Sequence, residues 1–245
     1  DENDDGAGAA TGSITSTINI TEDNDQPVIT LAGTPELDYQ ENESAAIIDG
    51  AITIEDVDDI NMSAATVTLT AGGFTASDGD NTTTKDLGDD GDVLGIDSSY
   101  QAPTGFALND NTSTGNTWTL TDNNNGNAVV LTITRTDSVG NGSGDKQLDF
   151  SGTATKAVYQ GLFQKVTYYS DSDNLTDINT NSTLSREVTW SVTDANDDDA
   201  GAETSSVTTT INITEDNDQP VITLAGTPEL DYQENDSAAI IDDAI

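Results

Sequence analysis

Clusters of carboxylate and amide side chains directly follow strand-like stretches of this sequence. Residues 22–25 read Glu-Asp-Asn-Asp, and the same four residue types return at 215–218. Calcium binds six to eight such oxygen atoms at about 2.3–2.6 Å, whereas magnesium requires stricter octahedral geometry. The chain contains no histidine and no cysteine, so it lacks the side-chain nitrogen and sulfur ligands that transition metals prefer. These clusters therefore predict sites for a divalent cation and favour calcium.

The overall charge of the chain supports the same prediction. Six lysine and arginine residues stand against 46 aspartate and glutamate residues, which gives a net charge of −40. Carboxylates at this density repel one another and destabilise a compact state unless cations neutralise them. The few basic residues are scattered singly, which disfavours nucleic acids and anionic membranes as partners. No run approaches the roughly 18–20 apolar residues of a membrane-spanning helix, so we expect no membrane insertion in this segment.

The elements that must position these clusters are predicted to be β-strands. Apolar residues alternate with polar ones in about a dozen short stretches, including 28–31, 67–69, 129–133, 188–192 and 207–213. One stretch differs, because Tyr159, Leu162, Phe163 and Val166 have the spacing of a short amphipathic helix. This pattern predicts an all-β sandwich with one short helix. A Gly-, Asn- and Asp-rich region at about 72–146 is expected to add loops and strands to it.

A long internal repeat divides the chain. Residues 1–52 align without a gap on 194–245, at an offset of 193, and differ at eight positions. We therefore expect 1–26 to be the C-terminal strand and linker of a preceding repeat, 27–219 a complete repeat, and 220–245 the N-terminal part of a following one. Tandem units of this kind mainly contact their neighbours. We interpret 27–219 as one enlarged sandwich because it contains no second junction; two ordinary sandwiches are the alternative.

The junction sequence resembles that of a known family. Glu-Asp-Asn-Asp-Gln-Pro at 22–27 is similar to the Asp-x-Asn-Asp-x-Pro linker of cadherins and of the cadherin-like repeats in giant bacterial adhesins, called RTX or biofilm-associated adhesins. Residues 150–168 and 186–194 also look like these adhesins, whereas about 72–146 differ. The resemblance implies a cadherin-like or immunoglobulin-like β-sandwich with an enlarged insertion, in a tandem array that calcium makes rigid.

The resemblance also implies a set of calcium ligands. Asp23, Asn24 and Asp25 match the linker motif, Glu41 matches a glutamate early in the domain, and Asp56 belongs to an Asp-x-Asp pair. The full candidate set is Glu22, Asp23, Asn24, Asp25, Glu41, Asp56, Asp58, Glu215, Asp216, Asn217, Asp218 and Glu234. We expect Glu41 and the Asp-x-Asp pair to lie at neighbouring strand ends, so that the first junction is complete. The corresponding pair of the second junction would fall after residue 245.

The resemblance implies an extracellular protein of the bacterial cell surface. Such repeats act in cell adhesion as extenders, which contact neighbouring repeats and hold a distal ligand-binding region away from the cell. Two alternatives stay open: the insertion, with Tyr100, Phe106 and Trp118, could bind a glycan or protein of a host or matrix, or the array could assemble into a surface filament. Trp118 and Trp190 lie in period-two alternation, which predicts core packing. We expect no enzyme, because aromatic residues, common in catalytic clefts, make up only 5% of the chain.

Overall fold

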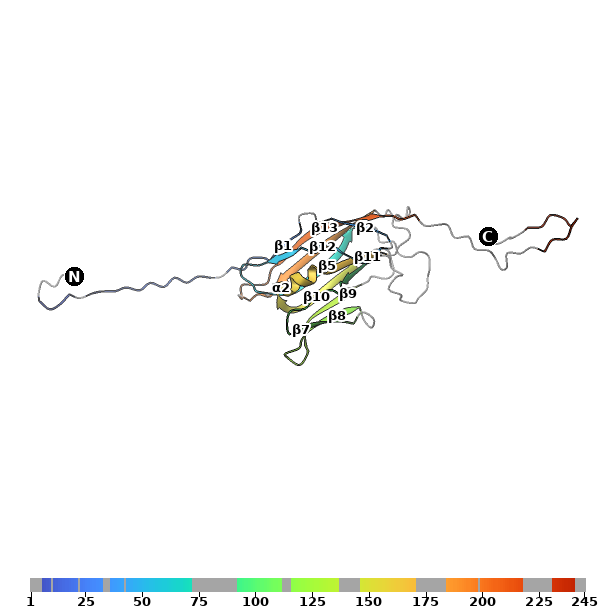
Figure 1. Ribbon diagram of the computed structural model, residues 1–245. Coiled ribbons are helices and arrows are strands. Elements are labelled where there is room, and N and C mark those ends of the chain that lie inside the picture. The colour runs from blue at the N-terminus through green and yellow to red at the C-terminus, as the bar shows by residue number, and fades with distance from the viewer. Residues whose placement is uncertain are drawn as a thin grey trace.

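The computed structural model describes residues 6–9, 11–21, 23–32, 36–41, 43–71, 92–111, 116–136, 146–170, 184–197, 199–217 and 231–240. Within these ranges the chain forms mostly β-strands in sheets, with one helix, as the alternating sequence predicts. Figure 1 shows the folded region and the N-terminal segment that leads into it in an extended conformation. No helix among these residues is long and apolar enough to cross a membrane.

The strands form three sheets. They are β1 (Val28–Thr30), β2 (Glu36–Gln40), β3 (Ala46–Ile47), β4 (Thr53–Glu55), β5 (Asn61–Ala71), β6 (Asp92–Ile96), β7 (Phe106–Asp110), β8 (Thr117–Asp122), β9 (Ala128–Thr136), β10 (Lys146–Thr155), β11 (Val166–Ser170), β12 (Ser185–Asp194) and β13 (Thr204–Thr214). The largest sheet has the order β2-β13-β12-β5-β10-β9-β8-β7, and the smaller ones have the orders β3-β11-β6 and β1-β4. β2 pairs parallel with β13, and the other described pairs are antiparallel.

The apolar residues of the strands face a common core. In β12, Val188, Trp190 and Val192 are buried, and the residues between them are more exposed, as period-two alternation requires. The large sheet and the β3-β11-β6 sheet meet through an edge-to-face contact of Tyr39 and Tyr168, whose ring centroids lie 5.0 Å apart. This arrangement is compatible with a β-sandwich. Trp118 and Trp190 are both buried, which confirms the expectation that they pack in the core.

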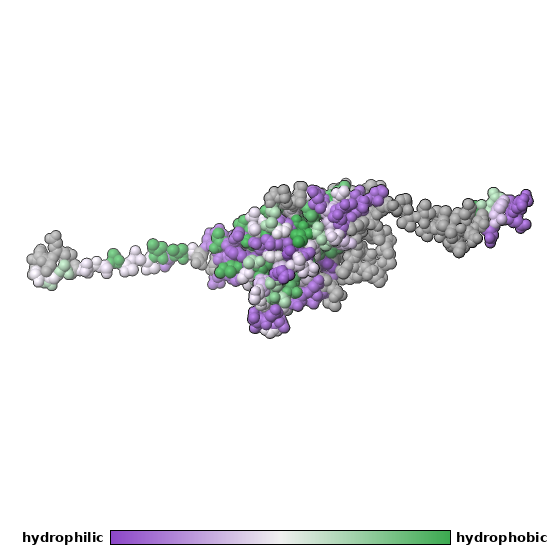
Figure 2. All heavy atoms as spheres, in the orientation of Figure 1, coloured by the Kyte–Doolittle hydropathy of each residue, from purple (hydrophilic) through white to green (hydrophobic). Residues whose placement is uncertain are grey.

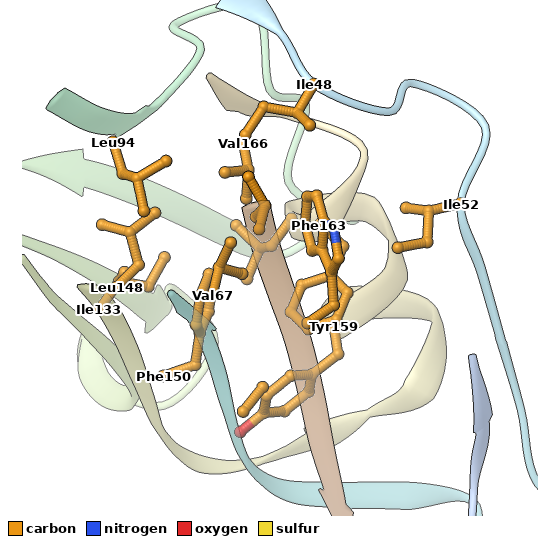
Figure 3. Close-up of a cluster of buried hydrophobic side chains, with 14 of the residues drawn as sticks. Ile48, Ile52, Val67, Leu94, Ile133, Leu148, Phe150, Tyr159, Phe163 and Val166 are labelled. Carbon is orange, nitrogen blue, oxygen red and sulfur yellow. The ribbon is translucent and has the colours of Figure 1, made fainter. Parts of the chain in front are cut away.

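The helix α2 (Lys156–Phe163) covers part of this core. Its buried residues include Tyr159, Leu162 and Phe163, the three residues of the predicted helical spacing that lie within it. Figure 3 shows the Tyr159 and Phe163 side chains directed from the helix toward the strands. Phe163 contacts Phe150 and Trp190 with ring-centroid distances of 5.6 and 5.2 Å. Such aromatic pairs add stability beyond the burial of their surface.

The inserted region extends the sandwich. β6 joins the β3-β11-β6 sheet, and β7, β8 and β9 lengthen the large sheet beyond β10. Leu94, Leu120 and Ile133 from these strands belong to the same cluster of buried residues as the rest of the core. Residues 72–91, the first part of the Gly-, Asn- and Asp-rich region, fall outside the described residues.

A buried ion pair connects the two larger sheets. The Arg186 Nε of β12 donates to Asp92 Oδ2 of β6 at 2.5 Å, and both side chains are almost completely buried. The Tyr168 hydroxyl donates to the other carboxylate oxygen of Asp92 at 2.5 Å. A buried charge is tolerated when it is paired and hydrogen-bonded in this way.

Candidate metal centre

Three aspartates converge at one end of the sandwich. Asp56 and Asp59 follow β4, and Asp194 is the last residue of β12. One carboxylate oxygen from each lies within 4.8 Å of the others, and the three side chains are 7%, 1% and 0% exposed. Buried carboxylates this close together are unfavourable unless protons or a cation offset their charge. The group is therefore a candidate cation site.

The loop after β4 is shaped by its first aspartate. Asp56 Oδ1 accepts the backbone N–H groups of Asp58 and Asp59 at 3.0 and 2.7 Å, which forms a tight Asx turn. This turn places Asp59 on the buried side and leaves Asp58 exposed. Lys156, the first residue of α2, supports the loop, because its Nζ donates to the Asp56 carbonyl at 2.6 Å and the Asp59 carbonyl at 3.3 Å.

The loop between β12 and β13 is fixed in the same manner. Asp194 Oδ1 accepts the N–H of Asn196 at 3.2 Å, and its Oδ2 accepts the N–H of Glu203 at 2.8 Å. Asp197 connects this loop to the first one, since its N–H donates to Asp59 Oδ1 at 2.5 Å and its carboxylate accepts the N–H of Asn61 at 3.1 Å. The two acidic loops therefore form one hydrogen-bonded unit.

The linker before the repeat lies against both loops. Asn24 Nδ2 donates to Asp194 Oδ2 at 3.0 Å and to the carbonyl of Gly201 at 2.5 Å. The N–H of Asp25 donates to Asp58 Oδ2 at 2.9 Å. The aspartate cluster is therefore a meeting point of the linker, the β4–β5 loop and the β12–β13 loop.

Several oxygen atoms in this group are buried without a hydrogen-bond partner. Among the described residues, these atoms include Asp56 Oδ2, Asp59 Oδ2 and Asn24 Oδ1. An unsatisfied buried acceptor costs about 1–3 kcal/mol, and more when it is charged. A cation bound among the three aspartates would satisfy the carboxylate oxygens, because such oxygens are the ligands of hard divalent ions, and the Asn24 amide bonds directly to one of these aspartates. The residues present therefore fit a divalent metal ion.

The electrostatics of the cluster agree with its geometry. Burial raises the pKa of Asp59 above its ordinary value of 3.8, and the carboxylates of Asp194, Asp56 and Asp197 raise it further. The hydrogen bond from the Asp197 N–H opposes this pKa increase. The metal-free site thus makes the ionised form of Asp59 less favourable than that of a free carboxyl group, and a bound cation would oppose this effect.

The structure brings together part of the predicted ligand set. Asn24, Asp25, Asp56 and Asp58 lie at this centre, and Asp23 lies exposed in the linker. Glu22 and Asp218 fall outside the described residues. Sequence reasoning missed Asp59, Asp194 and Asp197, although all three stand in acidic runs at the ends of predicted strands. That position is the signal that could have identified them.

Glu41 lies at the other end of the repeat. Its N–H donates to the carbonyl of Thr214 at 3.0 Å, where β13 ends, whereas Asp194 lies where β13 begins. Because the strand's 11 residues are separated by ten steps of about 3.3 Å, the two ends are about 33 Å apart. The expectation that Glu41 lies beside Asp56 and Asp58 is therefore not met.

The remaining candidates follow β13. Glu215, Asp216 and Asn217 come directly after this strand and are exposed, so they lie near Glu41 at the C-terminal end of β13. Glu234 is exposed in the segment 231–240, which corresponds to the start of a following repeat. Each end of the repeat thus carries its own acidic group.

Comparisons of the chain with family models, with curated proteins and with solved structures found no match. A functional proposal for the chain therefore rests on the geometry of the aspartate cluster and on the sequence.

Proposed function

We propose that the chain is a structural extender of a bacterial cell-surface adhesin, in which calcium stiffens each junction between cadherin-like repeats. The observation that carries this proposal is the contact of the linker with the buried aspartate cluster. Asn24 and Asp25 belong to the linker, and they touch Asp194 and Asp58 of the repeat that follows. An ion at this point would hold two units of the chain in a fixed relation.

The ligand chemistry favours calcium. Asp56, Asp59 and Asp194 would supply carboxylate oxygens, and the Asn24 Oδ1 would supply a neutral one. Water and backbone carbonyls commonly complete the six to eight oxygens that calcium takes in a flexible shell. When bound, the ion supplies positive charge that offsets the mutual repulsion of the three carboxylates.

The residues of the chain explain how such an ion would change its mechanics. Without a cation, hydrogen bonds from Asn24 and Asp25 hold the described part of the linker to the repeat. With a cation, the Asn24 amide and both acidic loops share one centre, so the linker loses its freedom to swing. A ligand that binds only the ordered state stabilises that state, and it does so more strongly at higher ligand concentration.

The tandem organisation gives this junction its role. Residues 11–21 match β13 at the offset of 193, and they carry Ile14, Ile18 and Ile20, which are 97%, 84% and 86% exposed. The matching residues Val207, Ile211 and Ile213 pack on or in the core of the complete repeat. We therefore treat 1–26 as the end of a preceding repeat, which would bury these isoleucines in its own core. A row of such units, each joined by calcium, forms a rod suited to projecting a distal adhesive region outside the cell.

Calcium titration of the 245-residue chain tests the proposal. Isothermal calorimetry should detect binding, and thermal unfolding should occur at a higher temperature in calcium than in a chelator. Asp194→Asn should weaken the binding, because it removes a central carboxylate. Absence of binding heat together with an unchanged melting temperature would contradict the proposal. Binding of the chain to a glycan array would contradict a purely structural role.

A further inference from the structure

Exposed apolar side chains occur in the loop that carries Asp56 and Asp59, and in the strand beside it. Val57 and Ile60 are 81% and 66% exposed, and they flank Asp58 in the loop after β4. Val28, at the start of β1, is 56% exposed and pairs with Glu55 just before that loop. Figure 2 shows hydrophobic atoms at the end of the domain where the N-terminal segment joins it.

This clustering is unusual for the body of the repeat. Among the described residues from 27 to 217, the large hydrophobic side chains that are exposed are Val28, Val57, Ile60, Val129 and Leu184. The first three lie together at the end that receives the linker. Apolar groups concentrated beside a junction indicate a surface that another part of the molecule covers.

The length of the linker identifies what covers this surface. By the repeat offset, Thr21 corresponds to Thr214, the last residue of β13. The N–H of Asp25 is bonded to Asp58, so only four residue steps separate the surface from the end of the preceding repeat. Four extended residues span at most about 14 Å. The C-terminal end of a preceding repeat must therefore lie within about 14 Å of Asp58, the neighbour of Val57 in the loop.

That opposite end carries an apolar residue of its own. The carbonyl of Leu184 accepts the N–H of Ile213 at 2.7 Å, so Leu184 lies beside the end of β13, just before the linker. Leu184 is 41% exposed. The copy of Leu184 in a preceding repeat would occupy the same place next to Ile20, the counterpart of Ile213.

We infer that Val28, Val57 and Ile60 form a docking surface for the C-terminal end of the preceding repeat, with that repeat's copy of Leu184 as its apolar contact. This inference rests on the proposed tandem array. The ion would neutralise the acidic groups at the junction, and the apolar contact would fix the rotation of one repeat against the next. The two interactions use different side chains of the same loop, so separate substitutions test the ion and the apolar contact.

The test uses two complete repeats, residues 27–219 followed by 27–245, which keeps the natural spacing. A repeat has its own core, and the preceding segment 11–21 is exposed throughout, so joined copies should fold independently. Because the chain has no cysteine, one engineered cysteine in each repeat allows specific spin labelling. Pulsed electron paramagnetic resonance then measures the distribution of distances between the repeats.

The variants are Val57→Ser with Ile60→Ser in the second repeat, and Leu184→Ser in the first. Val129→Ser is the matched control, since Val129 is an exposed valine at the start of β9, which β10 separates from β5 in the large sheet. In calcium we expect a narrow distance distribution for the parent and for the control. The junction variants should lower the population of the main distance about tenfold, from the loss of buried apolar area. Combining the variants of the two repeats should lower the population of the main distance little further, because both remove the same contact.

A distribution that is unchanged in the junction variants, or changed equally in the control, would overturn the docking surface. If calcium narrows the distribution and the serine variants leave it unaltered, the metal junction stands and the apolar contact is refuted. If calcium has no effect on the parent, the calcium junction fails, and the comparison with Val129→Ser still decides the docking surface.

Discussion

Replacing Asp59 by asparagine should stabilise the metal-free repeat and remove most of the stability that calcium adds. Asp59 is the aspartate of the cluster whose pKa is raised by burial and by its acidic neighbours. Its Oδ1 accepts the N–H of Asp197, a role that an asparagine oxygen can keep. The new amide nitrogen would stand in place of the unpartnered Oδ2 and could donate to the carboxylate of Asp56 or Asp194.

The size of the effect follows from the geometry. Two unit charges 4.8 Å apart repel by about 3.5 kcal/mol at an effective dielectric constant of about 20. Relaxation of the loops reduces this repulsion, so we expect a gain of about 2 kcal/mol without metal. For a domain of this size, that gain raises the melting temperature by about 4–8 °C.

Calcium should stabilise the parent chain much more than the Asp59→Asn variant. At a concentration about 100 times its dissociation constant, calcium adds about 2.7 kcal/mol to the stability of the parent chain. If the loss of one carboxylate weakens affinity about a hundredfold, the same calcium concentration adds only about 0.4 kcal/mol to the variant. The calcium-induced increase in melting temperature should therefore almost vanish.

Thermal unfolding at pH 7, followed by circular dichroism in a chelator and in calcium, measures both effects. Asp49→Asn is the matched control, because Asp49 is also buried but its two carboxylate oxygens accept the N–H groups of Ala32 and Ala51. The control should lose stability equally in both conditions and keep its calcium response. A variant of Asp59 that is destabilised in the chelator, or that keeps the parent's calcium response, would refute the reasoning.

Two further predictions concern pH and the core. The pKa of Asp59 is higher in the folded chain than its ordinary value of 3.8, so the stability of the metal-free chain should fall as pH rises from 3.8 to the folded pKa. Calcium binding in this pH range should release protons. Calorimetry in buffers of different ionisation enthalpy measures this release. Calcium affinity that does not weaken as pH falls through that window would contradict the linkage. Arg186→Met should cost about 3–5 kcal/mol in denaturant unfolding, with or without calcium, because it leaves the buried Asp92 charge without its cation. A cost that depends on calcium would show that this ion pair is coupled to the junction.

Local periodicity was sufficient to predict the class of fold and some of its details. Alternation of apolar residues predicted strands around Trp118 and Trp190, and both side chains are buried. The spacing of Tyr159, Leu162 and Phe163 predicted the helix that the structure places at Lys156–Phe163. These features depend on the spacing of apolar residues within a single strand or helix, which can be read from a short stretch of sequence.

The candidate site depended on information that local patterns do not contain. Glu41 lies at the far end of the repeat because β2 pairs parallel with β13, a strand distant in the sequence. Asp59 is buried and Asp58 exposed because the side chain of Asp56 accepts two backbone N–H groups. Both outcomes arise from strand pairing and turn geometry, which an acidic run such as 55–59 does not specify.

The parallel pairing of β2 with β13 also determines how the repeat would carry a mechanical load. Tension in a tandem chain enters before β1 and leaves after Thr214, so it pulls β2 and β13 in opposite directions along their length. The paired positions from Glu36 and Thr210 to Gln40 and Thr214 are then loaded together in shear. Their hydrogen bonds must break nearly at once and cannot open one by one. A repeat with this pairing would resist extension under force much better than its equilibrium stability alone suggests, since forced unfolding depends on the rate of unfolding.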